Sequence, residues 1–305
     1  MKRKATQVLN EAYGEINAKG SLIPKSDLLP HAFGDKKLIA WNVGGLRAVL
    51  AKRPELIKQM WTEQKPAVLG IMETKISEKD EVAVAGQINH LIGQQVKLIF
   101  NHSTAKKGYS GTLLIVDLEK CGKPENVVKG IGSADDEGRV ISAYLPKLDC
   151  VAVLCYSPNS GQTLDRLNFR VKTFDPKLAL FCKDMHAKQN APLVLMGDLN
   201  VAVDDEDIWN VDAAHIPKSA GTTEEERDSF RTHFLSAGFV DSFKKVHAGS
   251  TGWFSYWSVR AGNKPKNRGL RLDYALTLGI PDIKDAFILD EYAPNGDHGA
   301  VGLSL

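Results

Sequence analysis

The sequence predicts an α/β protein in which two β-sheets pack together and helices cover their outer faces. Short apolar runs, typical of strands, alternate with longer amphipathic segments, typical of helices, and this alternation continues to the last residue. Some runs are joined only by turns, as 139–145 and 151–157 are, which indicates antiparallel neighbours. No repeat, linker or low-complexity tract divides the chain. We therefore expect one domain, residues 38–305, preceded by a polar N-terminal extension, residues 1–37.

The strands are predicted where apolar and β-branched residues follow one another and turn-forming residues bound the run. By this criterion the strands span residues 38–43, 67–73, 96–102, 112–117, 139–145, 151–157, 193–200, 252–258, 271–276, 286–289 and 300–305.

Amphipathic spacing predicts helices over residues 46–64, 81–91, 164–186 and 224–237. We expect the first helix to break or restart at Pro54 and Pro176 to divide the third, because proline removes a backbone donor from a helix. The fourth has a start signal in Thr222 and Glu225, which stand at capping-box spacing. Within the N-terminal extension, residues 8–16 show a modest helical pattern.

The composition is that of an ordinary globular protein, with 43% hydrophobic and 25% charged residues in 305. No apolar run approaches the roughly 18 residues of a membrane span, so we expect no membrane association. The basic start, residues 1–4, is not followed by a hydrophobic region, so a secretory signal is not expected. Glu11 and Glu15 disfavour a mitochondrial transit peptide. The basic start fits a solvated tail or a nuclear address, and we expect an intracellular protein of the cytoplasm or nucleus.

Charge and cysteine usage exclude some classes of site. The formal net charge of +2 is too small to indicate a nucleic-acid partner by itself, so a polyanion site requires lysines and arginines gathered on one face. The four cysteines, Cys121, Cys150, Cys155 and Cys182, show no zinc-type C-x-x-C spacing. Cys150 and Cys155 are separated by an odd offset, so on one strand they face opposite sides of the sheet. We expect four reduced structural thiols.

Three carboxylate or amide side chains follow buried strands. Glu73 ends an apolar run, where a carboxylate can ligate a hard cation such as Mg²⁺. Asp198 and Asn200 are two residues apart, so on a strand their side chains point the same way. One of them can take a proton from water while the other donates to a phosphate oxygen. Taken singly, Glu73 also fits a solvated surface position, and the Asp198–Asn200 pair also fits a polar turn.

An acid and an imidazole form a second candidate pair. Asp273 alternates with two apolar neighbours, so it opposes the apolar face of its strand, and an acid there can orient a histidine. His298 is the expected partner, because the glycines that flank its loop allow the backbone to approach a ligand. A lone histidine in a loop also fits an exposed position.

Phenol, amide and basic side chains add a candidate phosphate and nucleic-acid surface. Tyr156, Asn159 and Tyr109 lie at strand ends and supply donors suited to phosphate oxygens, although they also fit plain turns. The aromatic run 253–257 leads into a basic loop, 260–268. That order favours a groove that holds a backbone and receives an unstacked sugar or base. The alternative is a core strand followed by a solvated hairpin.

Five motifs, in their order along the chain, resemble the exonuclease III-like apurinic/apyrimidinic (AP) endonucleases of base excision repair. They are W-N-V-G-G-L-R-A (41–48), E-T-K (73–75), G-D-L-N (197–200), R-L-D-Y (271–274) and G-D-H (296–298). The resemblance runs from about residue 38 to residue 305. It implies a four-layered α/β sandwich of two packed mixed β-sheets flanked by helices, and a monomer that acts on double-stranded DNA. The implied cofactor is Mg²⁺, with Mn²⁺ as a substitute.

The resemblance also implies roles, residue by residue. Asp198 would activate the attacking water, with Tyr156 as phenolate the alternative base, and Asp273 would hold His298. The implied catalytic residues are Asn42, Tyr156, Asp198, Asn200, Asp273 and His298, and the implied metal ligands are Glu73 and Asp297. The residues implied in DNA binding are Arg47, Gly108, Tyr109, Asn159, Asn210, Lys266, Tyr256, Leu270 and Leu272, of which Tyr256, Leu270 and Leu272 match the pocket for a flipped-out abasic sugar.

Four positions depart from the pattern of the family, namely Ile39, Gly44, Arg260 and Leu270, and two of them bear on the expected site. Gly44 stands where relatives usually carry Asp or Asn beside the metal, so we expect weaker metal binding, since Mg²⁺ accepts water as a replacement ligand. Leu270 replaces a larger aromatic residue, so we expect a less exclusive abasic pocket.

The resemblance implies hydrolysis of the phosphodiester 5′ to an abasic site, which leaves a 3′-hydroxyl and a 5′-deoxyribose phosphate. The first alternative keeps the fold and makes 3′–5′ exonuclease, 3′-phosphodiesterase or 3′-phosphatase the main activity. The second is a catalytically impaired protein that binds abasic DNA.

Overall fold

The computed structural model of the protein describes residues 25–28, 34–293 and 297–305. One set of strands comprises β1 (Lys37–Asn42), β2 (Val68–Met72), β3 (Val96–Asn101), β4 (Thr112–Asp117), β11 (Asp285–Leu289) and β12 (Ala300–Ser304). The other comprises β5 (Glu125–Lys129), β6 (Val140–Leu145), β7 (Cys150–Tyr156), β8 (Leu193–Asp198), β9 (Val240–Asp241) and β10 (Asp273–Leu278). The α-helices are α2 (Leu46–Lys52), α3 (Pro54–Gln64), α4 (Glu81–Ile92), α5 (Leu118–Cys121), α6 (Leu167–Phe169), α7 (Asp175–Gln189), α8 (Glu224–His233) and α9 (Ser242–Val246).

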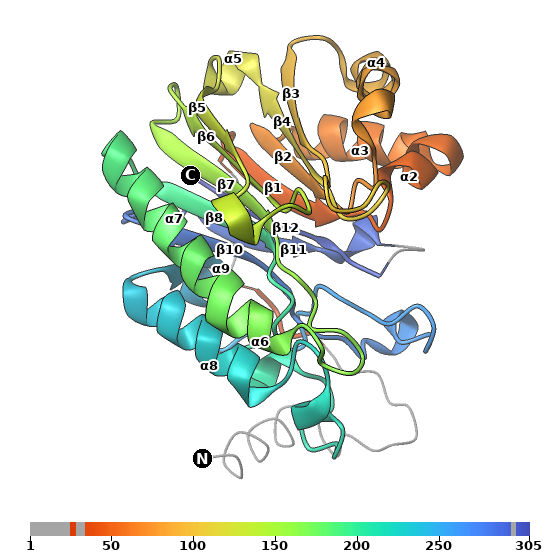
Figure 1. Ribbon diagram of the computed structural model, residues 1–305, viewed down its shortest axis with the longest axis vertical. Helices are drawn as coiled ribbons and strands as arrows, with labels where there is room; N and C mark the ends of the chain where they lie inside the picture. Colours follow the sequence, from red (N-terminus) through yellow and green to blue (C-terminus); the bar gives the residue numbers. More distant parts are fainter. Residues whose placement is uncertain (1–24, 29–33, 294–296) are drawn as a thin grey trace.

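The strands form two six-stranded sheets that pack face to face (Figure 1). The first sheet has the order β11-β12-β1-β2-β4-β3 and the second the order β5-β6-β7-β8-β10-β9. β1 is parallel to β2 and β7 is parallel to β8, while the other neighbours are antiparallel, so both sheets are mixed. Helices α2, α3 and α4 cover the first sheet, and α7 and α8 cover the second. The expected four-layered α/β sandwich is confirmed.

The alternation of side chains along the strands assigns each residue to a layer. In β1, Leu38 and Ala40 pack in the core between the two sheets, whereas Ile39 and Trp41 pack against the helices of the first sheet. All four of these side chains are buried. Because successive side chains of a strand point to opposite faces, an apolar run serves both interfaces at once. This is why the central strands read as nearly continuous apolar runs.

Cysteines and helix breaks largely follow the sequence expectations. The four cysteines are buried and free, and Cys150 and Cys155 belong to different core clusters on opposite faces of β7. Pro54 is the first residue of α3, where its missing N–H costs no hydrogen bond. Pro176 does not divide the third helical segment. It lies in the first turn of α7, directly after a π-helical turn, Arg170–Phe174, so the helical path continues.

Two further expectations are corrected. Thr223 and Glu226, not Thr222 and Glu225, form the capping box of α8, which ends at His233 before a 3₁₀ turn. Residues 252–258 do not form a strand, although Tyr256 makes isolated β-bridges. The amides of Ser255 and Tyr256 both donate to the carbonyl of Leu270, at 3.0 and 2.9 Å, and consecutive amides of a regular strand do not share one acceptor.

The sequence analysis missed β5 and the two-residue β9, whose side chains are mostly exposed or half-buried, so neither shows an apolar pattern. The helical pattern at residues 8–16 lies outside the described residues. Ser26, within the described part of the N-terminal extension, exchanges hydrogen bonds with Thr251. Among the residues that the structure describes, no helix has both the length and the apolarity to cross a bilayer.

Candidate active site

The candidate catalytic side chains meet at one edge of the sandwich because of the strand directions. Asn42 ends β1, Tyr156 ends β7 and Asp198 ends β8, while Asp273 begins β10, which runs antiparallel to β8. Asp273 is the register partner of Asp198. Glu73 follows β2, which is parallel to β1. The carboxyl ends of parallel strands and the start of an antiparallel neighbour share one edge, so residues far apart in sequence converge.

Glu73 lies at the centre of a hydrogen-bonded cluster. Its Oε1 accepts from Asn42 Nδ2 at 3.1 Å and from the Tyr156 hydroxyl at 2.9 Å, and its Oε2 pairs with Lys75 Nζ at 2.8 Å. Burial raises the pKa of Glu73, but Lys75 and the hydrogen bonds outweigh burial and hold the pKa below its ordinary value. Burial and the Glu73 carboxylate raise the pKa of Tyr156 well above 10, so its phenol is protonated at neutral pH. Tyr156 is therefore disfavoured as a phenolate base.

Asp198 is a buried carboxylate with the properties of a general base. Its Oδ2 accepts from Asn42 Nδ2 at 2.9 Å, and its Oδ1 accepts from the Asn200 amide at 2.9 Å. Burial and the neighbouring Asp273 carboxylate raise the pKa of Asp198 to about 7, although His298 opposes the rise. A base with a pKa near the working pH combines the ionised form with a useful proton affinity.

His298 is held as an imidazolium by two carboxylates. Its Nδ1 lies 2.8 Å from Asp273 Oδ2 and its Nε2 lies 3.7 Å from Asp198 Oδ2. Burial lowers the pKa of His298, but Asp273 and then Asp198 raise it to about 10. The sequence analysis missed Ser255, whose hydroxyl donates to Asp273 Oδ2 at 2.7 Å and accepts from the amides of Leu272 and Asp273 at 3.0 Å. A single small hydroxyl residue within an aromatic run is the signal that could have found it.

Two amides form a further set of donors. Asn159 Nδ2 donates to Asn200 Oδ1 at 3.0 Å, so the two expected phosphate contacts lie together. Asn200 has φ +49°, a left-handed conformation that asparagine tolerates better than most residues. Beneath them the buried Arg170 donates to the carbonyls of Pro158, Leu199 and Asn200. Arg170 thus ties both amide-bearing loops to the π-helical turn, a contact that no local pattern predicts.

An apolar patch adjoins His298. Tyr256, Leu270 and Leu272, which were expected to line an abasic pocket, belong to one cluster together with Ile208 and Ile216. The Tyr256 ring lies 5.0 Å from the His298 ring, centroid to centroid, and isolated β-bridges join Tyr256 to Leu270 and to His298.

The other expected DNA contacts lie on helix α2 and on loops. Arg47 is exposed and pairs with Asp80 at 2.6 Å. Gly108 has φ +67°, which favours glycine, and Lys266 is exposed in a 3₁₀ turn. Asn210 Oδ1 is buried and has no hydrogen-bond partner among the described residues. The hydroxyl of Tyr109 accepts from two arginines that the sequence analysis missed, Arg139 at 3.2 Å and Arg166 at 3.3 Å.

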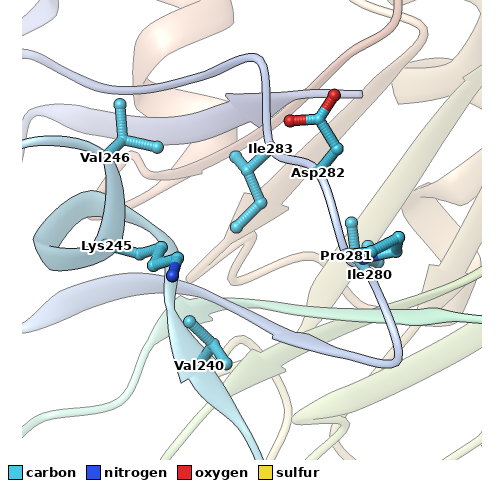
Figure 2. Close-up of a pocket in the computed structure, with 7 residues that line it drawn as sticks. All are labelled: Val240, Lys245, Val246, Ile280, Pro281, Asp282 and Ile283. Atoms are coloured by element: carbon cyan, nitrogen blue, oxygen red, sulfur yellow. The ribbon is translucent and has the colours of Figure 1, made fainter.

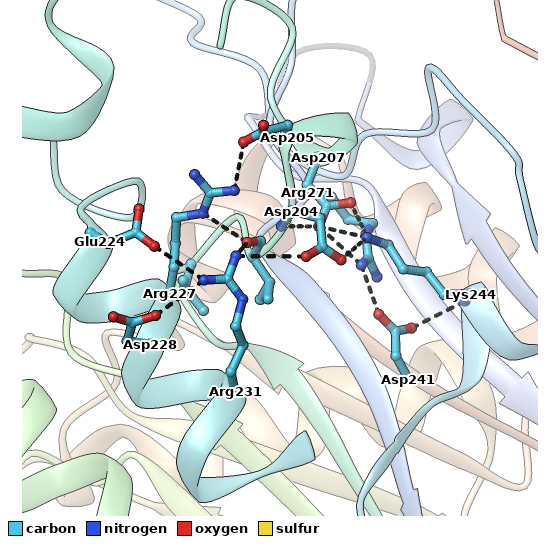
Figure 3. A network of polar contacts seen from close by, with 12 residues as sticks. Asp204, Asp205, Asp207, Glu224, Arg227, Asp228, Arg231, Asp241, Lys244 and Arg271 are labelled. Carbon is cyan, nitrogen blue, oxygen red and sulfur yellow. Dashed lines mark hydrogen bonds and ion pairs between the residues drawn. The ribbon is translucent and has the colours of Figure 1, made fainter. Parts of the chain in front are cut away.

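The arginine of the R-L-D-Y motif is structural. Arg271 forms ion pairs with Asp207 at 2.8 Å and with Asp241 at 2.7 Å, and Lys244 joins Asp207 at 3.2 Å (Figure 3). The amide of Arg271 also donates to the carbonyl of Asp207 at 2.9 Å. This network fixes the loop after β8 against the start of β10, so it positions Asp273 without reaching the site.

The two acids that the resemblance implies as metal ligands, Glu73 and Asp297, lie near Gly44. The Oδ1 of Asp297 lies 3.9 Å from where a Cβ of residue 44 would stand, and Lys75 Nζ links Glu73 to the carbonyl of Gly44. Ligand atoms of Asp198, Asp273 and His298 lie within 4.8 Å of one another, so this buried cluster could also hold a metal ion. Carboxylate oxygens are ligands that suit a hard cation such as Mg²⁺.

A separate pocket of about 450 Å³ lies at the other end of β10 (Figure 2). Residues 280–283 line it, with Val240, Lys245 and Val246. Since β10 runs from Asp273 at the site to Leu278, the residues that follow it lie at the opposite edge of the sheet. This pocket is therefore not part of the candidate site.

Comparisons with known proteins agree with the geometry. The sequence matches the Endonuclease/Exonuclease/phosphatase family over residues 39–277. An exodeoxyribonuclease of Bacillus subtilis is 38% identical over 240 residues, 78% of this chain and 86% of that protein. The DNA repair nuclease APEX1 of Danio rerio is 36% identical over 277 residues, 88% of this chain and 82% of that protein. Among solved structures, AP endonuclease LMAP from Leishmania major matches with a TM-score of 0.79 at 27% identity, over 98% of this chain and 97% of that one.

Fold, site and relatives define an enzyme that hydrolyses phosphate esters. The chain belongs to the endonuclease/exonuclease/phosphatase family, in the branch of the exonuclease III-like AP endonucleases.

Proposed function

We propose that the protein is a Mg²⁺-dependent AP endonuclease, which hydrolyses the phosphodiester 5′ to an abasic site in duplex DNA. The observation that carries the proposal is the position of His298. Its Nε2 faces the base Asp198 at 3.7 Å, and its ring lies 5.0 Å from that of Tyr256 in the apolar patch. The reacting phosphate and the flipped sugar next to it would therefore lie side by side.

Asp198 would act as the general base. A water molecule between this carboxylate and the phosphate gives up a proton to Asp198 as its oxygen bonds to phosphorus. The bond from phosphorus to the 3′ oxygen breaks, and that oxygen takes a proton from solvent to leave as a 3′-hydroxyl, while Asp198 later returns its own proton to solvent. The other product is a 5′-deoxyribose phosphate. Such help from a base is typically worth about 10²–10⁴-fold in rate.

The donors around the phosphate would stabilise the charge that develops on its oxygens. The imidazolium of His298 and the amides of Asn159 and Asn200 are fixed by hydrogen bonds to neighbouring groups, so they do not reorganise during the reaction. Bound at Glu73 and Asp297, Mg²⁺ would supply further positive charge at the same oxygens.

Selectivity for abasic sites would come from the patch of Tyr256, Leu270 and Leu272. A base that is already missing leaves no stacking or pairing to break when the sugar leaves the helix. Contacts of Arg47 and Lys266 with the DNA backbone would be independent of sequence. We further propose that the protein acts as a monomer inside the cell, in the cytoplasm or the nucleus.

The second candidate function is 3′-end processing, as exonuclease, 3′-phosphodiesterase or 3′-phosphatase. The smaller Leu270 favours it, and so does the Bacillus subtilis relative that is named an exodeoxyribonuclease. A protein that binds abasic DNA without cutting it is the third candidate, motivated by Gly44.

The test uses a fluorescent duplex with one tetrahydrofuran abasic analogue, with and without Mg²⁺, and the cut position is mapped. Undamaged, nicked and 3′-phosphorylated duplexes are run in parallel. We expect a Mg²⁺-dependent cut 5′ to the analogue, at least ~10²-fold slower in Asp198→Asn. Asp228→Asn, which changes an exposed acid on α8, is the matched control. Faster turnover of the 3′-phosphorylated duplex would favour the second candidate, and binding without any cut would favour the third.

A further inference from the structure

The ammonium group of Lys75 lies between Glu73 and the backbone of Gly44. Its Nζ is 2.8 Å from Glu73 Oε2 and donates to the carbonyl oxygen of Gly44 at 2.7 Å. Glu73 and Lys75 both have φ near +50°, and the amides of Thr74 and Lys75 are bound to the carbonyls of Gly111 and Ser110. This fixed turn holds the lysine and the glutamate side by side.

The surroundings of Gly44 contain room for a side chain that this protein lacks. Among the residues that the structure describes, a Cβ at position 44 would meet only Asp297 Oδ1, at 3.9 Å, an ordinary van der Waals separation. The residue has φ +64°, which Asp and Asn adopt at modest cost. An acid at position 44 would add an oxygen beside Asp297 and a second acceptor near the ammonium of Lys75.

We propose that Lys75 is a built-in competitor for the metal site, whose ammonium must leave Glu73 before a divalent cation binds, and that Gly44 strengthens this competition. The proposal rests on the proposed function, because it takes Glu73 as a metal ligand. It adds a residue that sets the affinity of the site for its cation.

Among the donors to Glu73, Lys75 is the one that can leave most easily. Asn42 is buried and also bound to Asp198, and the hydroxyl of Tyr156 belongs to a strand residue packed against the core between the sheets. The side chain of Lys75 is 41% exposed, whereas that of Glu73 is 20% exposed. A lysine released to water regains its hydration and its rotamer freedom. A divalent cation on Glu73 would also repel an ammonium that stayed.

The test measures binding of Mn²⁺ to the DNA-free protein by electron paramagnetic resonance of the free ion, with Mg²⁺ as competitor. Lys75→Met should lower the Kd for Mn²⁺ by up to about fivefold, the range that a partly exposed ion pair supports. Lys75→Arg, which keeps the charge, should stay close to the wild type. Lys79→Met removes a nearby exposed lysine that does not contact Glu73, and it is the matched control.

Gly44→Asp gives a second variant to measure, because the added carboxylate should also lower the Kd for Mn²⁺. In the double variant with Lys75→Met the gain should be smaller than the product of the two single gains, because both changes relieve the same competition. An unchanged or higher Kd in Lys75→Met, in a protein whose melting temperature matches the wild type, overturns the proposal. If Glu73→Gln abolishes Mn²⁺ binding in that case, the assignment of Glu73 as a metal ligand is kept and only the proposed competition by Lys75 is rejected. If Glu73→Gln binds Mn²⁺ normally, both the competition and the proposed metal site fail.

Discussion

Replacing Asp273 by asparagine separates the charge of His298 from its position. The Asp273→Asn variant would keep a side-chain oxygen near His298 Nδ1, which lies 2.8 Å from the native carboxylate, but would remove the anion that does most to raise the pKa of the imidazole. Raising that pKa from its ordinary 6.5 to about 10 corresponds to on the order of 5 kcal/mol of preference for the imidazolium. Without the anion, mainly Asp198 would oppose the effect of burial, so we expect the pKa of His298 to fall and the neutral ring to be more populated at pH 8.

The assay is single-turnover cleavage of the abasic duplex as a function of pH. The cleavage rate of the wild type should follow a bell-shaped pH profile. Ionisation of Asp198 near pH 7 sets its lower limb, and deprotonation of His298 near pH 10 sets its upper limb. Because the Asp273 carboxylate raises both pKa values, both limbs of the Asp273→Asn profile should move to lower pH. At pH 8 the rate should fall by about 10²–10³-fold, the effect of losing one preorganised donor. Lowering the pH towards 6 should restore part of the lost cleavage rate of Asp273→Asn.

Stability gives a second measurement with a definite sign. A histidine whose pKa is raised on folding stabilises the protein fully below pH 6.5, and this contribution is lost as the pH rises through about 10. In urea unfolding, the difference in the free energy of unfolding between the wild type and Asp273→Asn should therefore be large at pH 6 and become smaller above pH 10. Asp285→Asn, at a buried acid 3.4 Å from His247 and outside the site, is the matched control that should leave the rate profile unshifted. An upper limb that stays near pH 10 in Asp273→Asn would refute the reasoning.

Three further changes test other parts of the site. Tyr256→Ala should raise KM for the abasic duplex and reduce its preference over undamaged DNA, because the ring beside His298 is lost; equal selectivity in competition assays would remove Tyr256 from the pocket. Arg170→Met should lower the free energy of unfolding by about 3–5 kcal/mol, since it leaves Asp175 and other buried partners unpaired, and chemical denaturation measures this. Arg47→Ala should weaken binding alike on all sequences and reduce the slope of log K against log salt by about 1, which fluorescence anisotropy at several salt concentrations detects.

The layers of the fold could be predicted because the central strands are apolar on both faces. The segment 112–117 was predicted as a strand with the bounds that β4 has, and most other strands agree within a few residues. The exposed edge strand β5 carries no such signal. Residues 252–258 show the opposite error, since aromatic residues suggested a strand where the chain instead folds around the hydroxyl of Ser255.

The acids of the site could be predicted because each lies at or next to the end of a strand, within a short sequence motif. Their supporting groups could not. Ser255 reaches Asp273 across 18 residues, and Arg170 reaches the carbonyl of Asn200 across 30, from inside a helical segment. Such contacts depend on how separate elements pack, and no local spacing encodes them. Lys75 lies within a recognised motif. Its pairing with Glu73, however, depends on a turn with positive φ that the amino-acid sequence alone does not reveal.

A single amide joins the two acids that the mechanism keeps apart. Asn42 Nδ2 donates to Glu73 Oε1 at 3.1 Å and to Asp198 Oδ2 at 2.9 Å, while the Gly44 amide donates to Asn42 Oδ1 at 3.0 Å. The environments drive the acids in opposite directions, because Lys75 and other donors lower the pKa of Glu73 whereas burial and Asp273 raise that of Asp198. Two carboxylates with separated pKa values can divide the work, one as a permanent anion for a cation and one as a proton acceptor. Asn42 fixes the spacing between these two roles, so a change at Asn42 should disturb metal binding and the lower limb of the pH profile together.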